Sequence, residues 1–246
     1  MKNQHNVHEK CGIAISIIIP TLNEEQVLGK TLASLQNKQN LEVIVVDGGS
    51  SDTTLALAQK TDCRIISSPK GRSRQMNRGA AEARGEVLLF LHADTLLPDN
   101  FPELILDAVR QPAFVAGAFS LAIDSPRKSL SVIAWFANLR SRLLHLPYGD
   151  QALFITSSMF KVLGGFPELE IMEDFIFMQK IKKKGKVIIL SECALTSARR
   201  WQQMGITRTT LINQLIVCGH FIGIPSAILA GWYRRMRGMG QSSPEK

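Results

Sequence analysis

The chain has 246 residues, 45% of them apolar, and this fits a globular α/β protein of one large or two small domains rather than a disordered chain. Four scattered cysteines, with no CxxC pair and no histidine at zinc-like spacing, argue against a disulfide framework or a zinc site and favour a reducing compartment such as the cytoplasm. A formal net charge of +8 predicts an anionic partner, which is a nucleotide, a nucleic acid or a membrane surface.

Short apolar runs alternate with helical patterns four times in the first hundred residues. The runs occupy residues 13–19, 42–46, 63–67 and 87–91. Apolar runs of this length, bounded by turn residues, predict strands that are buried on both faces. Helices are expected between them, the first capped by Asn23 and the third running from Arg72 to Ala83. The alternation predicts a doubly wound, mostly parallel sheet flanked by helices.

A carboxylate follows the fourth apolar run directly. The run ends in His92-Ala93-Asp94-Thr95, so Asp94 lies just past the carboxyl end of a strand. Ligands of open α/β sheets bind at that edge. The pattern leaves two interpretations of Asp94 open, an oxygen ligand for a divalent cation or a residue that caps the following turn.

The second strand ends in the loop Asp47-Gly48-Gly49-Ser50. Two glycines allow a ligand to approach the backbone closely, and an acid at this place can accept a hydrogen bond from a ribose or a base. Neither a GxGxxG nor a GxxxxGK[ST] motif is present, so the dinucleotide and P-loop fingerprints do not apply. The loop is either a nucleotide-binding loop or an ordinary tight turn capped by Asp52.

The pattern loosens after residue 98. Helices are expected at 101–109 and 128–145, the second one amphipathic, and strands at 114–123 and 152–155. A further helix opens with Glu173 and Asp174 and ends at Lys184-Gly185. Paired acids at a helix start are usually partners of the helix dipole, so spacing alone favours that role over catalysis.

The apolar segment at 211–233 has three interpretations: a packed helical hairpin, a pair of helices at a membrane surface, or one poor membrane span. Trp232 and Tyr233 precede a basic cluster that includes Arg234 and Arg235, and this favours contact with an anionic membrane surface. We therefore expect a peripheral protein at the inner face of the plasma membrane. Nucleic-acid binding is not expected, because the basic runs lack interleaved aromatic residues and a recognition module.

Taken in order, five motifs resemble family 2 glycosyltransferases of the GT-A fold. They are SIIIPTLNE at 16–24, VDGGSSD at 46–52, Asn77 with ARGE at 83–86, HAD at 92–94, and Glu173-Asp174. Three further segments are similar to a bacterial subgroup known as radical-SAM/selenodomain-associated transferase 2, which is linked to arsenosugar biosynthesis genes. These segments are KGRSRQMN at 70–77, YGDQ at 148–151 and SARRW at 197–201.

The resemblance implies a glycosyltransferase domain at 12–201, with a nucleotide-binding half at about 12–98 and an acceptor half at about 99–201. A C-terminal helical segment that contacts the membrane is expected at 202–237. Residues 1–11 and 238–246 are expected to be disordered.

The implied reaction is the inverting transfer of a sugar from a nucleotide-diphosphate sugar to an acceptor hydroxyl, assisted by Mg²⁺ or Mn²⁺. Asp174 matches the general base, with Glu173 as the alternative. Asp94 matches a metal ligand, while His92 replaces the first acid of the family's DxD motif. Arg199 belongs to a later basic and aromatic motif near the diphosphate or acceptor. The resemblance assigns to the donor and cofactor site Pro20, Thr21, Glu24, Asp47, Gly49, Arg72, Arg74, Asn77, His92, Ala93, Asp150, Gln151, Arg200 and Trp201.

Two other functions stay open. A sugar nucleotidyltransferase would need a glycine-rich basic loop after the first strand, where this chain has Pro20-Thr21-Leu22-Asn23-Glu24. The replacement of an acid by His92 suggests the other alternative, a catalytically impaired nucleotide-sugar-binding protein at the membrane.

Overall fold

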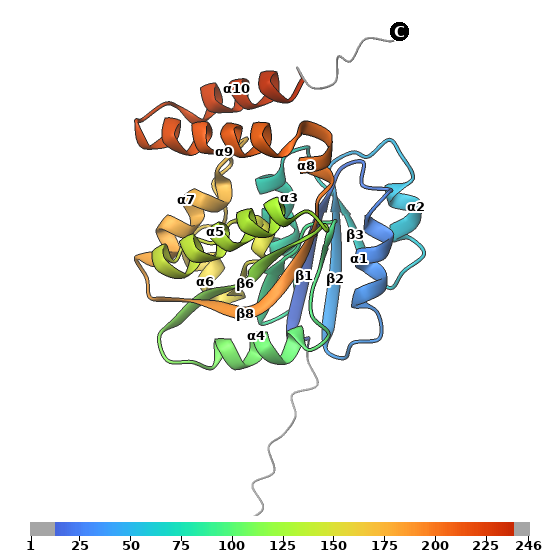
Figure 1. Cartoon of the computed structure of the whole chain (residues 1–246). Coiled ribbons are helices and arrows are strands. Elements are labelled where there is room, and N and C mark those ends of the chain that lie inside the picture. The colour runs from blue at the N-terminus through green and yellow to red at the C-terminus, as the bar shows by residue number, and fades with distance from the viewer. Residues whose placement is uncertain (1–12, 239–246) are drawn as a thin grey trace, which may run out of the picture.

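The computed structural model describes residues 13–238 of the chain. A twisted sheet crosses the middle of the molecule, with helices packed on its faces, and a pair of helices near the C-terminus lies across one end (Figure 1). Eight strands form one sheet in the order β3-β2-β1-β4-β7-β6-β8-β5. The predicted α/β class with a mostly parallel sheet is therefore confirmed.

The strands are β1 (Ile15–Thr21), β2 (Leu41–Asp47), β3 (Arg64–Ser67), β4 (Val87–Phe90), β5 (Thr95–Leu96), β6 (Phe114–Asp124), β7 (Phe154–Thr156) and β8 (Lys186–Ser197). The helices are α1 (Leu28–Leu35), α2 (Thr54–Ala58), α3 (Arg72–Glu82), α4 (Phe101–Val109), α5 (Lys128–Leu144), α6 (Ser157–Val162), α7 (Glu173–Lys182), α8 (Arg199–Met204), α9 (Ile206–Phe221) and α10 (Ser226–Gly238). A short 3-10 turn covers Gly149–Gln151.

The first four predicted strands form the parallel half of the sheet. β1 pairs in parallel with β2 and β4, and β2 pairs in parallel with β3. Antiparallel pairings occur in the other half, where β7 joins β4 to β6 and β5 joins the edge at β8. Because the first four strands run in one direction, their carboxyl ends meet at a single edge of the sheet.

Both faces of the sheet carry a hydrophobic core. On one face, strand residues such as Ile17 pack with Leu32 of α1 and Phe101 of α4. On the other, Ile18 packs with Met76 of α3 and Phe177 of α7. The neighbours Ile17 and Ile18 are both fully buried, as the unbroken apolar run predicts.

Gly117 of β6 is required by close packing against β7. A Cβ placed on this residue would lie 2.2 Å from Cζ of Phe154, whose ring is fully buried between the neighbouring elements. Real Cβ atoms do not approach ring carbons so closely, so the Phe154 ring occupies the space that any side chain at 117 would need.

A buried polar network ties the opposite end of the parallel strands together. The Glu42 carboxylate accepts hydrogen bonds from Oγ of Ser16 at 2.7 Å, Nη1 of Arg64 at 2.6 Å and the amide of Arg84 at 2.9 Å. Burial raises the pKa of Glu42, but these hydrogen bonds and the Arg64 charge outweigh burial and hold that pKa below its ordinary value of 4.5.

The structure differs from the local expectations in three places. Asn23 does not cap α1, which begins at Leu28 without a side-chain cap, because Asn23 adopts φ 55° and bonds the neighbouring loop instead. The long strand β8 was not expected from the sequence. The amphipathic helix expected at 128–145 is present as α5, but its apolar residues do not all face inward, since Leu130 is buried while Phe136 and Leu143 are exposed.

The C-terminal segment folds back on itself. Helices α9 and α10 pack as a hairpin in which Ile212 and Ile216 contact the fully buried Leu229. Within residues 13–238, no helix combines the length and the apolar character that crossing a membrane requires. Residues 211–233 therefore belong to two packed helices joined by a turn, not to one continuous span. Apart from Gly238, which ends α10, the termini predicted to be disordered lie outside the described residues.

Candidate active site

The carboxyl edge of the parallel strands holds two interlocked loops. The amide of Asn23 donates to Oγ of Ser50 at 2.9 Å, and Oδ1 of Asn23 accepts from the amide of Ser51 at 2.9 Å. The Asp47 carboxylate accepts hydrogen bonds from the amides of Gly49 and Ser50 at 2.8 and 2.9 Å. These bonds hold Asp47 and Gly49 in a fixed turn at the edge of the sheet.

Asp52 bonds both loops at once. Its carboxylate accepts from the amide of Thr54 at 3.0 Å and from the amide of Glu25 at 3.2 Å. Asp52 thus caps the turn, which leaves both interpretations of the loop open, and it fixes the loop that carries Pro20 and Thr21 relative to the loop of Asp47.

The later basic motif reaches the same edge. Arg199, the first residue of α8, donates to Oε2 of Glu24 at 2.5 Å. Arg200 bonds Asn213 at 3.0 Å and also the hydroxyl of Tyr233, so it connects the site to the C-terminal hairpin. Residues far apart in the sequence therefore meet where the first parallel strands end.

His92 follows β4 and faces this edge. Its Nε2 atom is buried and makes no hydrogen bond to any residue in the described range 13–238. Burial of the ring, and then the charges of Arg72 and Arg200, hold the pKa of His92 well below 6.5. The imidazole is therefore neutral at physiological pH, with a ring nitrogen left available for a ligand.

Asp94 lies two residues further, just before β5. Burial raises its pKa, and the charges of Arg199 and Arg72 partly offset that effect. Among the described residues, His, Cys, Asp and Glu form no group of three or more that could hold a metal ion by itself. Asp94 is therefore a single carboxylate next to two arginines rather than part of a preformed metal cage.

Asp174 occupies the first turn of α7 on the other side of the pocket. Its Oδ2 accepts from the amide of Gly149 at 2.7 Å, and its Oδ1 accepts from the amide of Phe175 at 2.7 Å. Met172 at the helix N-cap, two positions before Asp174, has φ 66°, a left-handed conformation that is uncommon outside glycine. This turn aims the Asp174 carboxylate at the loop of Gly149.

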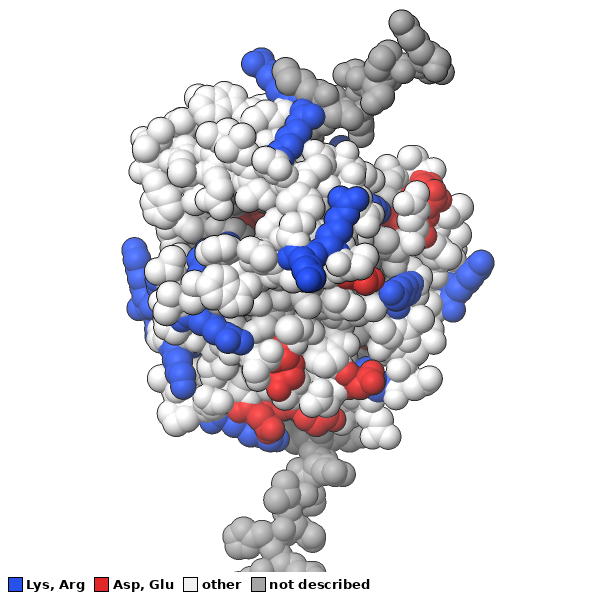
Figure 2. All heavy atoms as spheres, viewed as in Figure 1, with Lys and Arg blue, Asp and Glu red and all other residues white. Residues whose placement is uncertain are grey.

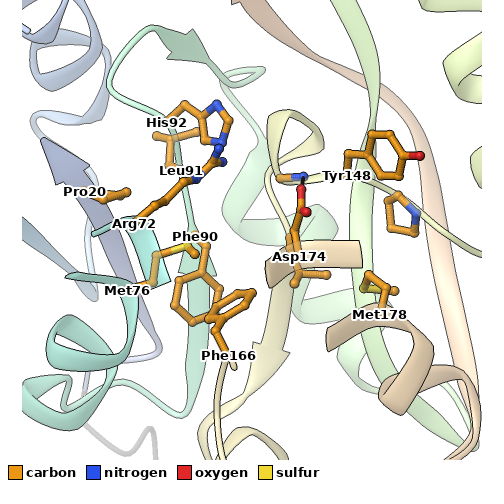
Figure 3. Close-up of a pocket in the computed structure, with 13 residues that line it drawn as sticks. Pro20, Arg72, Met76, Phe90, Leu91, His92, Tyr148, Phe166, Asp174 and Met178 are labelled. Atoms are coloured by element: carbon orange, nitrogen blue, oxygen red, sulfur yellow. Dashed lines mark hydrogen bonds between the residues drawn. The ribbon is translucent and has the colours of Figure 1, made fainter. Parts of the chain in front are cut away.

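Gly149 marks the place where the site residues converge. A Cβ placed on it would lie 2.6 Å from Nη2 of Arg72, 3.2 Å from Oδ2 of Asp174 and 3.3 Å from Nε2 of His92. The three side chains line one pocket, whose apolar floor includes Phe90 and Phe166 in edge-to-face contact (Figure 3). The topology therefore brings His92 and Asp174, about eighty positions apart in the sequence, to one pocket, whereas Asp94 and Glu173 are not among the residues that line it.

Glu173 is buried beside its neighbour. Its carboxylate lies 3.6 Å from Nε of Arg72. Burial and the adjacent Asp174 raise the pKa of Glu173 to about 7, although Arg72 acts in the opposite direction. Burial also raises the pKa of Asp150, against the opposing charge of Arg140.

Five of the predicted donor-site residues make contacts within the protein. Gln151 is fully buried and bonds Ser141 and the carbonyl of Phe119. Asn77 exchanges two hydrogen bonds with the backbone of Phe166, Trp201 packs in a small core, and Arg74 pairs with Glu168 at the surface. Ala93 is buried, and its carbonyl accepts from Oγ1 of Thr31.

The loop before Asp150 contributes to the site in a way that was not expected from the sequence. Arg140 of α5 lies 3.4 Å from the ring centroid of Tyr148 and donates to the carbonyl of Leu146. Tyr148 and Pro147 line the pocket beside Asp174. An aromatic residue followed directly by glycine was the available signal, since glycine permits close approach of other groups.

The chain is similar in sequence to known glycosyltransferases. The family model described as Glycosyl transferase family 2 matches residues 16–161. A probable glycosyltransferase, YdaM of Bacillus subtilis, is 37% identical over 103 residues, which is 36% of this chain and 23% of that protein. The dolichol-phosphate mannosyltransferase of Pyrococcus furiosus is 32% identical over 111 residues, covering 42% of this chain and 32% of that protein. The chain thus spans less than half the length of these curated relatives.

Solved structures share the fold. The mannosyltransferase PcManGT of Pyrobaculum calidifontis, in complex with GDP-Man and Mn²⁺, superimposes with a TM-score of 0.63 at 16% identity, covering 92% of this chain and 73% of that one. TarS of S. aureus, residues 1–349 in complex with UDP, gives a TM-score of 0.62 at 20% identity, covering 75% and 60%.

Proposed function

Because the chain belongs to glycosyltransferase family 2, we propose that it transfers a sugar from a nucleotide-diphosphate sugar to an acceptor hydroxyl with inversion of the anomeric centre. The observation that carries the proposal is the convergence of Arg72, His92 and Asp174 around Gly149. A cation, a neutral imidazole and a carboxylate there face one pocket at the edge of a parallel sheet, where α/β proteins bind their ligands.

The donor lies along the interlocked loops in this proposal. Pro20, Thr21, Asp47 and Gly49 hold the nucleoside, because their backbone is fixed by the bonds that join the two loops. The guanidinium groups of Arg72, Arg199 and Arg200 supply the positive charge that a diphosphate requires, and Arg suits phosphate oxygens because it donates two parallel hydrogen bonds.

A divalent cation fits the residues present. Mg²⁺ and Mn²⁺ bind through one or two carboxylates together with substrate phosphates, so the single carboxylate of Asp94 is sufficient when the donor supplies oxygens. His92, two residues earlier in the chain, offers a neutral, unpartnered Nε2 in the pocket beside Arg72 and Asp174. A cation bound there would neutralise charge that develops on the leaving diphosphate. That the similar mannosyltransferase of P. calidifontis was solved with Mn²⁺ supports this assignment.

Asp174 is the proposed general base. Its Oδ2 faces the pocket, and although it already accepts from the Gly149 amide, a carboxylate oxygen has a second lone pair for an acceptor hydroxyl. Proton removal there assists attack on the anomeric carbon from the face opposite the diphosphate. Glu173 is less suited to the role, because it pairs with Arg72 and is largely protonated below pH 7.

One alternative has a specific observation in its favour. A nucleotide-sugar-binding protein without transfer activity would also show His92 in place of an acid and no preformed metal cage among residues 13–238. Such a protein would bind donor without releasing nucleoside diphosphate in the presence of metal.

The test is nucleoside diphosphate release from a panel of UDP- and GDP-sugars with Mn²⁺, together with a thermal-shift measurement of donor binding. We expect Asp174→Asn to retain the donor-induced rise in melting temperature while losing about 10²- to 10⁴-fold in turnover. Asp107→Asn, the same change at an exposed position of α4, is the matched control. Full turnover by the Asp174 variant would remove this residue from the base role.

For location, we propose a cytoplasmic enzyme at the inner face of the plasma membrane. Support comes from the C-terminal hairpin, where the half-exposed Trp232 precedes the exposed Arg234 and Arg235. Within the family, the segments at 70–77, 148–151 and 197–201 support membership of the radical-SAM/selenodomain-associated transferase 2 subgroup.

A further inference from the structure

Helix α5 is built with an apolar face on its outside. The buried residues Leu130, Ala134 and Ser141 face the sheet. Large apolar side chains at three- and four-residue spacing cover the opposite side of the helix, and they are Val132, Trp135, Phe136, Leu139 and Leu143. We call these five residues the outer stripe.

The outer stripe is not a scatter of single exposed residues. Trp135 is 58% exposed and Phe136 is 60% exposed, and their rings contact each other at a centroid distance of 4.9 Å. Soluble proteins rarely present a contiguous apolar patch of this kind without a partner for it. Folding does not explain the stripe, because the helix is already anchored through its inner face.

The charged residues of helix α5 itself are all positive. Helix α5 contains Lys128, Arg140 and Arg142 but no Asp or Glu, and the chain has no acidic residue from 199 to 238. Figure 2 shows the region of α5 and the C-terminal hairpin as mostly uncharged with Lys and Arg at intervals, whereas Asp and Glu gather toward the lower half and right edge of the view.

The C-terminal hairpin also exposes apolar residues. Ile206 at the start of α9 and Ile133 of α5 both pack against the small core of Leu130, Ala198 and Trp201, and in Figure 1 helix α5 lies below the hairpin. Further exposed apolar residues on this hairpin are Leu211, Leu215, Phe221, Ile222, Ile228 and Trp232.

We propose that the outer stripe of α5 docks on an anionic lipid surface, with its aromatic side chains entering the headgroup region. An interfacial helix has this composition, with Trp, Phe and Leu on one face and flanking Lys and Arg. A second copy of the chain fits less well, since a two-fold contact would bring identical basic residues together without acidic partners. The inference deepens the proposed membrane location by naming α5, outside the C-terminal segment, as the element that enters the lipid.

Docking in this orientation places the active-site loop near the lipid surface. Tyr148 follows the last residue of α5 by four positions, and the Arg140 guanidinium stacks on its ring. The lipid-facing helix and the pocket wall are thus joined by a short, fixed connection.

Co-sedimentation of the full chain with phosphatidylglycerol-containing vesicles tests the inference. Each large apolar side chain removed from lipid contact weakens partitioning by roughly tenfold, so we expect Trp135→Ser/Phe136→Ser to bind at least about tenfold more weakly than wild type. The matched control is Val162→Ser on α6, a residue that is 72% exposed but lies outside the stripe. Circular dichroism and vesicle-free donor hydrolysis confirm that each variant is folded.

Tryptophan fluorescence gives a second measurement that does not depend on truncating the stripe. In Trp232→Phe, the tryptophans that remain are Trp135 and the buried Trp201, so a blue shift on adding anionic vesicles reports Trp135 entering lipid. Neutral phosphatidylcholine vesicles and high salt should reduce the shift, because screening weakens attraction to an anionic surface.

The outcomes are distinguishable. Failure of wild type to bind any vesicle overturns both the inference and the proposed membrane location, while the donor-hydrolysis assay still tests the enzyme. If the Trp135/Phe136 double variant binds vesicles as wild type does and Trp232→Ser loses binding, the role of α5 is overturned while the membrane location stands. A wild-type dimer in light scattering that the double variant converts to a monomer would assign the stripe to a protein interface and overturn the inference.

Discussion

The buried Glu173 should make the stability of this protein depend on pH in a specific way. Burial and the neighbouring Asp174 raise its pKa from an ordinary 4.5 to about 7. An acid with a raised pKa retains its proton in the folded state at pH values where the unfolded chain has released it. Stability from this group is therefore complete below pH 4.5, falls as the pH rises to about 7, and stays low above that.

The size of the effect follows from the same values. A change in pKa from 4.5 to about 7 corresponds to about 3 kcal/mol, because one pKa unit is worth about 1.4 kcal/mol. The side chain of Glu173 is only 7% exposed, so solvent screening reduces this figure little. Glu173→Gln cannot ionise, and its free energy of unfolding relative to wild type should rise by about 3 kcal/mol between pH 4.5 and pH 8.

Urea unfolding at a series of pH values measures this difference. Any constant cost of burying the amide cancels, because only the change with pH is compared. Glu103→Gln on the exposed side of α4 is the control and should show no such trend. A Glu173 variant whose stability runs parallel to wild type from pH 4.5 to 8 would show that Glu173 titrates normally and would refute the assigned burial.

Two further outcomes concern the scaffold. Glu42→Gln should lower the free energy of unfolding by about 2 to 4 kcal/mol at pH 7, since it leaves Arg64 without its buried partner. In urea unfolding this deficit should shrink below pH 4.5, where the wild-type carboxylate gains a proton. A deficit independent of pH would contradict the network. Gly117→Ala should lower the free energy of unfolding, measured by thermal unfolding, by about 1 to 3 kcal/mol or more, because the new methyl group meets the Phe154 ring. Adding Phe154→Leu to the same chain should recover part of that stability. If it recovers none, the strain lies elsewhere.

The parallel half of the fold could be predicted because its strands are buried on both faces. Segments such as Val87–Phe90 are apolar at every position, which excludes a strand with one solvent-exposed face. Strand β8 could not be found in this way, since Ser191 and Glu192 interrupt it and several of its residues are exposed. Its register with β6 depends on tertiary pairing that the local sequence does not encode.

The outward face of α5 shows another limit. Phe136 and Leu143 repeat with the same helical period as the buried Leu130, so periodicity identifies the helix but not which apolar stripe faces the core. When a helix has two apolar stripes, the elements that pack against it decide which stripe is buried.

The position of the candidate site could be predicted better than the residues that form it. Asp94 was singled out by its position at a strand end, whereas Asp174 and Arg72 were assigned through the family resemblance, because spacing alone favoured a helix-dipole role for Glu173 and Asp174. The side-chain amide of Gln151 is a group that often binds ligands, yet here its hydrogen bonds go to Ser141 and to the carbonyl of Phe119 in the interior. Only the assembled structure distinguishes a polar residue that binds ligand from one that satisfies the interior.

The most direct test of the proposed function is metal-dependent nucleoside diphosphate release, compared between wild type and Asp174→Asn at saturating donor. Wild type should release product with Mn²⁺ and stop when the metal is chelated, while the variant binds donor and turns over about 10²- to 10⁴-fold more slowly. Equal release by both proteins, or release unaffected by chelation, would contradict a metal-assisted transfer that uses Asp174 as the base.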